Sequence, residues 1–257
     1  MLWPFTPAGA EAFGLLLVRC LGFFIAGPLF AQRTLPAQVK VLLGAAVAIA
    51  LFPVAGVPTG GTIVTLPAFL FAVAGEAFVG ILLGFAAALP FVGIRMAGEL
   101  VGVQMGFGIV SVLDPREDQR ISVIAQFYDL LALLLFLLFD GHHLLLRALG
   151  TSVRAVPLGQ AVLGAHAVQQ VLALGGSIFI VALSVGGPLI AVLFLTDAAM
   201  GFVARTVPQM NIFIVGFPVK IGLGLLGLAL TLPFFTRTMD RLMSGLERDL
   251  LTILAGM

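Results

Sequence analysis

Two long stretches without any charged residue constrain this chain more than any other feature. No Asp, Glu, Lys or Arg occurs over the 35 residues from Val41 to Gly75, or over the 42 residues from Ala155 to Thr196. A transmembrane helix needs about 20 apolar residues to cross roughly 30 Å of hydrocarbon. Because 61% of the residues are apolar and only 10% are charged, the sequence predicts an all-α, multi-pass membrane protein and excludes an ordinary water-soluble domain.

Glycine and proline clusters, together with the few charges, divide the apolar sequence into about six expected helices. They lie near residues 12–30, 39–55, 66–94 and 121–139, from residue 168 onward, and near 216–235. The 14 residues from Leu100 to Leu113 are too few to cross a bilayer, so we expect a short re-entrant or partner-buried segment there. Past Arg237 we expect an amphipathic surface helix that docks on a partner or lies on the membrane. Its apolar face comprises Met239, Leu242, Met243, Leu246 and Leu250.

Two triplets containing glycine and proline are expected to break a helix or to act as hinges. The first, Gly186-Gly187-Pro188, lies inside the fifth expected helix, and the second, Gly216-Phe217-Pro218, opens the sixth. Proline has no amide hydrogen to donate, and its ring clashes with the preceding helical turn. The sequence therefore predicts a kink at the first triplet and a hinge at the second.

Four ionisable residues lie within or at the edge of apolar stretches: Arg19, Glu76, Asp129 and Asp197. An unpaired charge at this depth costs at least about 2.5 kcal/mol, so each needs a partner charge, a water-filled cavity or another subunit. They could form an ion or proton path, or they could pair to fix the register of the helices. Their small number and wide scatter favour pairing. Arg95 and Glu99, four residues apart, are expected to pair along one helix face.

Small residues at a spacing of four mark two expected close-packing faces. Gly80 and Gly84 form the first, and Gly98, Gly102 and Gly106 form the second. Such spacing lets another backbone approach closely. The second face leads into the short Leu100–Leu113 segment, which is the best local candidate for a pore-facing element because irregular backbone at membrane depth must be buried by protein or line a cavity.

Several classes of function have no support in the sequence. The net charge is +1, and no basic tract exists that could follow a nucleic acid. Cys20 has no second cysteine with which to form a disulfide or a zinc cluster. In Asp140-Gly141-His142-His143 the adjacent histidines would point about 100° apart on a helix, so we expect a cap after the fourth helix and no metal site. The motifs of hydrolases, phosphate-binding loops and zinc proteases are absent, which predicts neither enzyme activity nor a cofactor. The first positive charge is Arg19, so no cleaved signal peptide is expected.

Five short runs, taken in order, resemble the FliR family of flagellar biosynthetic proteins, to which the injectisome protein SctT is related. The runs are Gly27-Pro28 with Pro36, the stretch from Gly98 to Gly106 that ends in Gln104-Met105-Gly106, Asp114-Pro115, Asp140-Gly141-His142, and Gly216-Phe217-Pro218. Their order and the pattern of apolar helices agree with the family from end to end. The Gln-Met-Gly, Asp-Pro and Asp-Gly-His runs are more similar to the flagellar branch than to the injectisome branch.

The resemblance implies a subunit of the type III export gate in the bacterial inner membrane, within the flagellar basal body. Residues 1–165 would form a FliP-like helical unit, and residues 166–257 a FliQ-like hairpin with the amphipathic helix at its end. The partners would be FliP-like and FliQ-like subunits together with FlhB-like and FlhA-like export proteins. The gate would pass unfolded rod, hook and filament subunits outward, powered by the proton motive force, and the intramembrane charges would find partners across subunits.

The resemblance also implies a plug that closes the pore. Carried over to this sequence, the plug comprises Gln104, Met105, Gly106, Phe107, Gly108, Ile109, Val110, Ser111 and Val112. Flagellar relatives often place Ser-Phe-Ala after the motif where this chain has Gly108-Ile109-Val110, so Phe107 is the expected blocking side chain.

Two other functions stay open at this point. An injectisome export gate would use the same architecture. A small-solute secondary transporter would use Glu76, Asp129 and a helix broken at Gly186-Gly187-Pro188, because broken helices near the midplane mark transporter sites. The chain shows no convincing internal repeat, which weighs against the transporter. An intramembrane enzyme is the weakest alternative.

Overall fold

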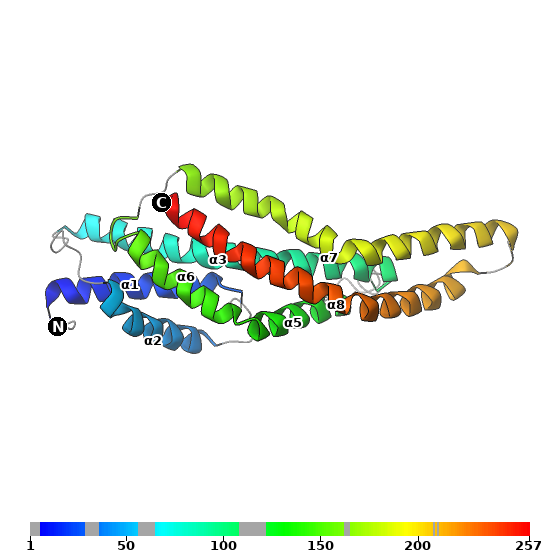
Figure 1. The fold of residues 1–257 in the computed structure, drawn as a ribbon, viewed down its shortest axis with the longest axis horizontal. Coiled ribbons are helices and arrows are strands. Elements are labelled where there is room, and N and C mark those ends of the chain that lie inside the picture. The colour runs from blue at the N-terminus through cyan, green and yellow to red at the C-terminus, as the bar shows by residue number, and fades with distance from the viewer. Residues whose placement is uncertain are drawn as a thin grey trace. The chain divides into compact units, whose positions relative to one another are not determined.

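The computed structural model describes residues 6–28, 36–55, 65–107, 122–161, 165–207, 209 and 211–257. Within these ranges every regular element is an α-helix (Figure 1), which confirms the predicted all-α fold. The helices are α1 (Pro7–Ala26), α2 (Ala37–Ala55), α3 (Leu66–Met105), α5 (Val123–Leu138), α6 (Gly141–Ala155), α7 (Ala165–Thr206) and α8 (Ile212–Ala255).

The number of membrane-spanning helices agrees with the sequence. Among the described residues, five helices, α1, α2, α3, α7 and α8, are long and apolar enough to cross a bilayer, and the bent pair α5 and α6 can count as a sixth span. The start of α1 follows from local chemistry, since the Thr6 side chain accepts a hydrogen bond from Gly9 N at 3.1 Å and Pro7 occupies the first helical position.

Two expected helix boundaries are wrong, and both errors have one cause. Residues 66–94 and the start of the supposed short segment form a single helix, because α3 continues for 40 residues to Met105. The expected span 216–235 and the expected surface helix are likewise one 44-residue helix, α8. Charged residues such as Arg95 and Arg237 oppose burial in lipid, but they favour helical backbone as much as their apolar neighbours do. The part of the short segment from residue 108 to 113 lies outside the described residues.

Neither predicted break interrupts a helix. The backbone is helical through Gly186-Gly187-Pro188 in α7 and through Gly216-Phe217-Pro218 in α8. Proline and glycine are tolerated in apolar helices because the surroundings supply other partners for the freed backbone groups. A hinge role for either triplet stays a prediction.

The first compact unit comprises residues 1–89, 140–175 and 243–257. In it α1 lies beside α2 (Figure 1) and buries Leu15, Leu16, Cys20 and Phe23. The end of α8 buries its apolar side as well, through Met243, Leu246, Leu250 and Ile253. The face that we expected to meet a partner or a lipid surface is therefore covered by this chain itself.

The second compact unit comprises residues 90–139 and 176–242. One face of α3 is fully buried here at Ile94, Ala97, Val101 and Met105, whose spacing of three and four is that of a helix face. Aromatic contacts add to this core, because the Tyr128 ring stacks on that of Phe235 with centroids 5.5 Å apart. The division into a FliP-like part, 1–165, and a FliQ-like part, 166–257, stays a prediction.

Candidate functional site

The end of α3 is the described part of the predicted plug, and it is a well-formed helix cap. Gly106 has a φ of +97°, and Gly106 N donates to Val103 O while Phe107 N donates to Gly102 O, both at 3.0 Å. These two bonds form the Schellman motif, which ends a helix on a left-handed glycine. Gly106 therefore stops α3 at Met105, a role that sequence spacing had assigned to helix packing alone.

Apolar contacts from α8 hold this cap. Met105 is fully buried, and a Cβ placed on Gly224 would come within 2.7 Å of Met105 Cγ and Sδ. A Cβ on Gly106 would come equally close to the Phe217 ring. The packing role of Gly224 was not predicted from the sequence, because that prediction used glycines spaced by four and no glycine lies four residues from Gly224. The close approach of Met105 shows that Gly224 makes room for this side chain.

Polar contacts hold the same turn of α3. Gln104 Nε2 donates to Asp197 Oδ2 at 3.0 Å, and the other oxygen of Asp197 pairs with the ammonium group of Lys220. Asp197 belongs to α7 and Lys220 to α8, so three helices meet through these side chains. Lys220 was missed as an intramembrane charge, although its place inside the apolar stretch 216–235 was a usable signal.

A second ion pair lies earlier on α3. Arg95 Nε donates to Asp129 Oδ2 at 2.6 Å, which joins α3 to α5. Arg95 therefore pairs across helices, and the expected pairing with Glu99 along one helix face is wrong. The arginine chain is long enough to prefer a carboxylate on a packed neighbour over one on its own helix.

In the part of the chain that the structure describes, the most deeply buried charges lie in the first compact unit. Arg19 and Glu76 are fully buried, and Arg19 Nε donates to Glu76 Oε2 at 2.5 Å. The two other guanidinium nitrogens donate to the carbonyl oxygens of Ser152 and Val156, each at 2.9 Å. Glu76 Oε1 accepts a hydrogen bond from Gly159 N at 2.8 Å. These contacts join α1, α3 and the end of α6.

All four predicted intramembrane charges therefore have partners inside the chain. The expectation that they pair across subunits is wrong, because Arg19 meets Glu76, Asp129 meets Arg95 and Asp197 meets Lys220. Pairing of this kind offsets the cost of placing a charge in an apolar layer. The contacts support the fixing of helix register and not an ion path.

The predicted packing glycines lie at close contacts on two parts of α3, with backbone atoms at Gly80, Gly84 and Gly98 and with side chains at Gly102 and Gly106. A Cβ on Gly80 would overlap the Arg19 carbonyl oxygen, and one on Gly84 would lie 2.6 Å from the carbonyl oxygen of Phe23, so α1 is in direct contact with α3 there. A Cβ on Gly98 would lie 2.5 Å from Ala125 Cα, and one on Gly102 would overlap the hydroxyl of Ser122, at the start of α5.

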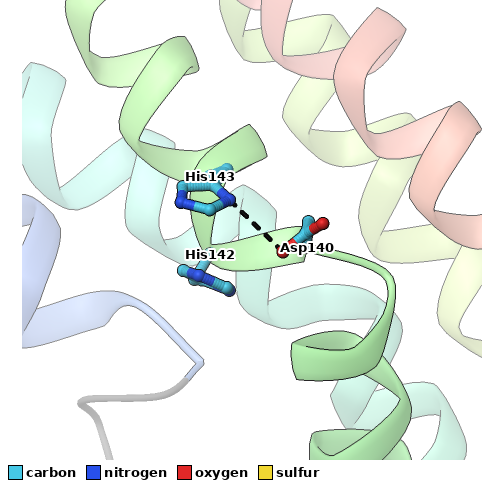
Figure 2. A group of neighbouring side chains, drawn as sticks. All are labelled: Asp140, His142 and His143. Carbon is cyan, nitrogen blue, oxygen red and sulfur yellow. Dashed lines mark ion pairs between the residues drawn. The ribbon is translucent and has the colours of Figure 1, made fainter.

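The Asp140, His142 and His143 side chains gather where α6 begins (Figure 2), and their ligand atoms lie within 4.8 Å of one another. Asp140 occupies the N-cap position with a φ of 55°, and its carboxylate lies 3.3 Å from His143 Nδ1. A cation here would face the positive end of the helix dipole. Figure 2 shows the two histidine rings beside each other. The Asp140 carboxylate pairs with His143 and makes no side-chain capping hydrogen bond to α6. The expectation that no metal binds here stays a prediction.

Comparison with known proteins gives consistent matches over nearly the whole chain. Residues 10–246 match the family "Bacterial export proteins, family 1". The chain is 34% identical to flagellar biosynthetic protein FliR of Pectobacterium carotovorum over 242 residues, covering 93% of this chain and 92% of the relative. It is 31% identical to FliR of Escherichia coli K12, covering 93% and 91%, and 36% identical to FliR of Bacillus subtilis, covering 82% of each. The chain therefore belongs to the FliR family of bacterial export proteins, as a multi-pass inner-membrane component of the flagellar export apparatus.

Proposed function

We propose that this chain is a structural and gating subunit of the flagellar export channel, and that the segment from Gln104 to Val112 closes its pore. It passes unfolded rod, hook and filament subunits across the inner membrane. It assembles with FliP-like and FliQ-like subunits and works with FlhB-like and FlhA-like export proteins. It catalyses no reaction, since its family is one of export proteins.

The capped end of α3 carries this proposal. A closing segment must leave a rigid element at a fixed point, and the Schellman cap at Gly106 provides such a point directly before Phe107. The buried Met105 side chain and the polar contacts of Gln104 prevent this turn from unwinding. Residues 108–112 lie outside the described residues, so their place in the plug rests on the family resemblance.

Exposed apolar side chains support assembly with partners inside the membrane. Phe179, Ile180 and Leu183 on α7 are each exposed by 60% or more, as are Ile214 and Leu230 on α8. Apolar surface on this scale is covered by lipid or by other subunits. FliP-like and FliQ-like subunits are the partners that the family resemblance names.

The contacts and the comparisons weigh against the two alternatives, a solute transporter and an injectisome gate. A solute transporter would need Glu76 and Asp129 free for a substrate or ion, but both are engaged in ion pairs. It would also need a broken helix at Gly186-Gly187-Pro188, where α7 is continuous. The three relatives compared are flagellar proteins, which favours the flagellar gate over the injectisome gate.

Removal of the segment Phe107–Val112 tests the proposed function. We expect the assembled complex to form but to conduct ions in planar bilayers, because the pore has lost its closing segment. The control is a deletion of equal length in the connection between α2 and α3, residues 56–61, which should leave the complex closed. Unchanged conductance in an assembled Phe107–Val112 deletion variant would exclude the plug.

A further inference from the structure

A polar clasp, formed by Gln104, Asp197 and Lys220, ties the last turn of α3 to α7 and α8. We propose that Asp197 and Lys220 are positioning residues for channel closure: they hold the end of α3 at the place from which the closing segment continues. This inference rests on the proposed function of the segment that starts at Gln104. It adds that Asp197 and Lys220, which lie outside that segment, hold the segment in its closing position.

The clasp uses both oxygens of one carboxylate. Asp197 Oδ2 accepts the hydrogen bond from Gln104, and Asp197 Oδ1 receives the Lys220 ammonium group. Both charges lie on helices apolar enough to span a membrane, where each unpaired charge would cost at least about 2.5 kcal/mol. Lys220 therefore holds the Asp197 carboxylate in place, and the carboxylate in turn holds Gln104.

Apolar contacts converge on the same turn from the same side. Phe217, Lys220 and Gly224 are three and four residues apart, so they form one stripe along α8. Phe217 lies against Gly106, Lys220 reaches the partner of Gln104, and Gly224 accommodates Met105. A single face of α8 therefore packs against the end of α3 at Met105 and Gly106, and it contacts Gln104 through Asp197.

The pair formed by Arg95 and Asp129 provides a matched control. It joins α3 to another helix through a charge-assisted hydrogen bond at 2.6 Å, and its side chains are 46% and 18% exposed. The Lys220 and Asp197 side chains have comparable exposures, 19% and 39%. The Arg95 pair lies nine residues before Gln104, about two and a half turns away, and does not touch the capped end. Its loss should weaken packing without releasing the closing segment.

The test compares Asp197→Asn and Lys220→Met with Asp129→Asn in the complex co-purified with its FliP-like and FliQ-like subunits. We expect the open fraction in planar bilayers to rise about tenfold for the first two variants, the change that 1.4 kcal/mol gives, and to stay at the wild-type value for Asp129→Asn. A nitroxide at Val103→Cys, in a Cys20→Ala background, should report greater motion of the last turn of α3 in the same two variants.

Two further variants keep the test decisive. Exchanging the charges, Asp197→Lys with Lys220→Asp, should restore closure to a large extent if mutual attraction positions the helix. Gln104→Leu keeps the ion pair between Asp197 and Lys220 and should still increase the motion of the nitroxide at position 103. This measurement replaces the conductance test if the single charge variants fail to assemble.

The closing-segment deletion separates the two proposals. If the Phe107–Val112 deletion leaks while the clasp variants stay closed with an immobile label, the positioning role is overturned and the gate function stands. If the deletion itself does not leak, the gate function has failed. Leakage in the clasp variants that disappears on charge exchange, with Asp129→Asn closed, supports the positioning role.

Discussion

Replacing Glu76 by alanine should remove this chain from the assembled complex. The substitution leaves the Arg19 guanidinium fully buried without its counter-charge, and it also removes the acceptor for Gly159 N. Breaking a buried ion pair by removing one partner costs about 3–5 kcal/mol. This is a large part of the roughly 5–15 kcal/mol that typically separates folded from unfolded protein. We expect the yield of complex in mild detergent to fall to background.

The control for this effect is Asp129→Ala, which breaks the pair with Arg95 and should lower the yield less, because the Arg95 side chain is 46% exposed whereas Arg19 is fully buried. Replacing both Arg19 and Glu76 by methionine should recover part of the yield, because no unpaired charge is left in the core. Recovery would be incomplete, since the carbonyl oxygens of Ser152 and Val156 lose their donors. Normal yield for Glu76→Ala, or equal loss for Asp129→Ala, would contradict the assigned role of the buried pair.

Replacing Gly80 by alanine should also abolish assembly, although alanine is the better helix former. The new Cβ would overlap the carbonyl oxygen of Arg19 and lie 2.9 Å from Phe23 N. Both are backbone atoms that cannot rotate away, so α1 must move off α3, and overpacking costs about 1–3 kcal/mol even where side chains can adjust. The measurement is the thermal unfolding temperature together with the yield of complex.

Gly14→Ala is the matched control because Gly14 also lies in a helix, α1, and a Cβ added there would meet nothing within 4 Å. Alanine should stabilise that helix by up to about 1 kcal/mol relative to glycine. The two substitutions, identical in chemistry, should therefore shift the unfolding temperature in opposite directions. A rise in both would mean that the contact between α1 and Gly80 is not close in the working complex.

The sequence predicted the spanning helices well because the cost of charge in lipid is a local property. Most of the uncharged stretch that ends at Gly75 lies in α2 and at the start of α3, and most of the one that ends at Thr196 lies in α7. The ends of α3 and α8 were misjudged because charges near Arg95 and Arg237 mark the end of apolar sequence, which is not the end of helical backbone.

The spacing of charged residues in the sequence does not predict which of them pair between helices. Arg19 and Glu76 are 57 residues apart in sequence, and only the packing of α1 on α3 brings them together. Arg95 was assigned to Glu99 because both lie on one helix face, whereas a neighbouring helix offered Asp129. Glycine spacing predicts where another helix can approach, but which helix approaches and which charges pair had to come from the structure.

The cap at Gly106 was within reach of the sequence. A glycine at the end of an apolar helix, followed by an apolar residue, is typical of a Schellman motif, but its spacing from Gly98 and Gly102 directed attention to packing. Lys220 could have been recognised as a fifth intramembrane charge from its position between Gly216 and Phe235. The pairing of Lys220 with Asp197 could not be predicted from the sequence, because it depends on how α7 packs against α8.

Native mass spectrometry of this chain, co-expressed with its neighbouring genes and purified in mild detergent, tests the central claim most directly. A gate subunit should be released as one defined complex with FliP-like and FliQ-like subunits, since its exposed apolar faces on α7 and α8 require cover. A stable monomer or homodimer, recovered without those subunits, would contradict the assignment of this chain to the gate.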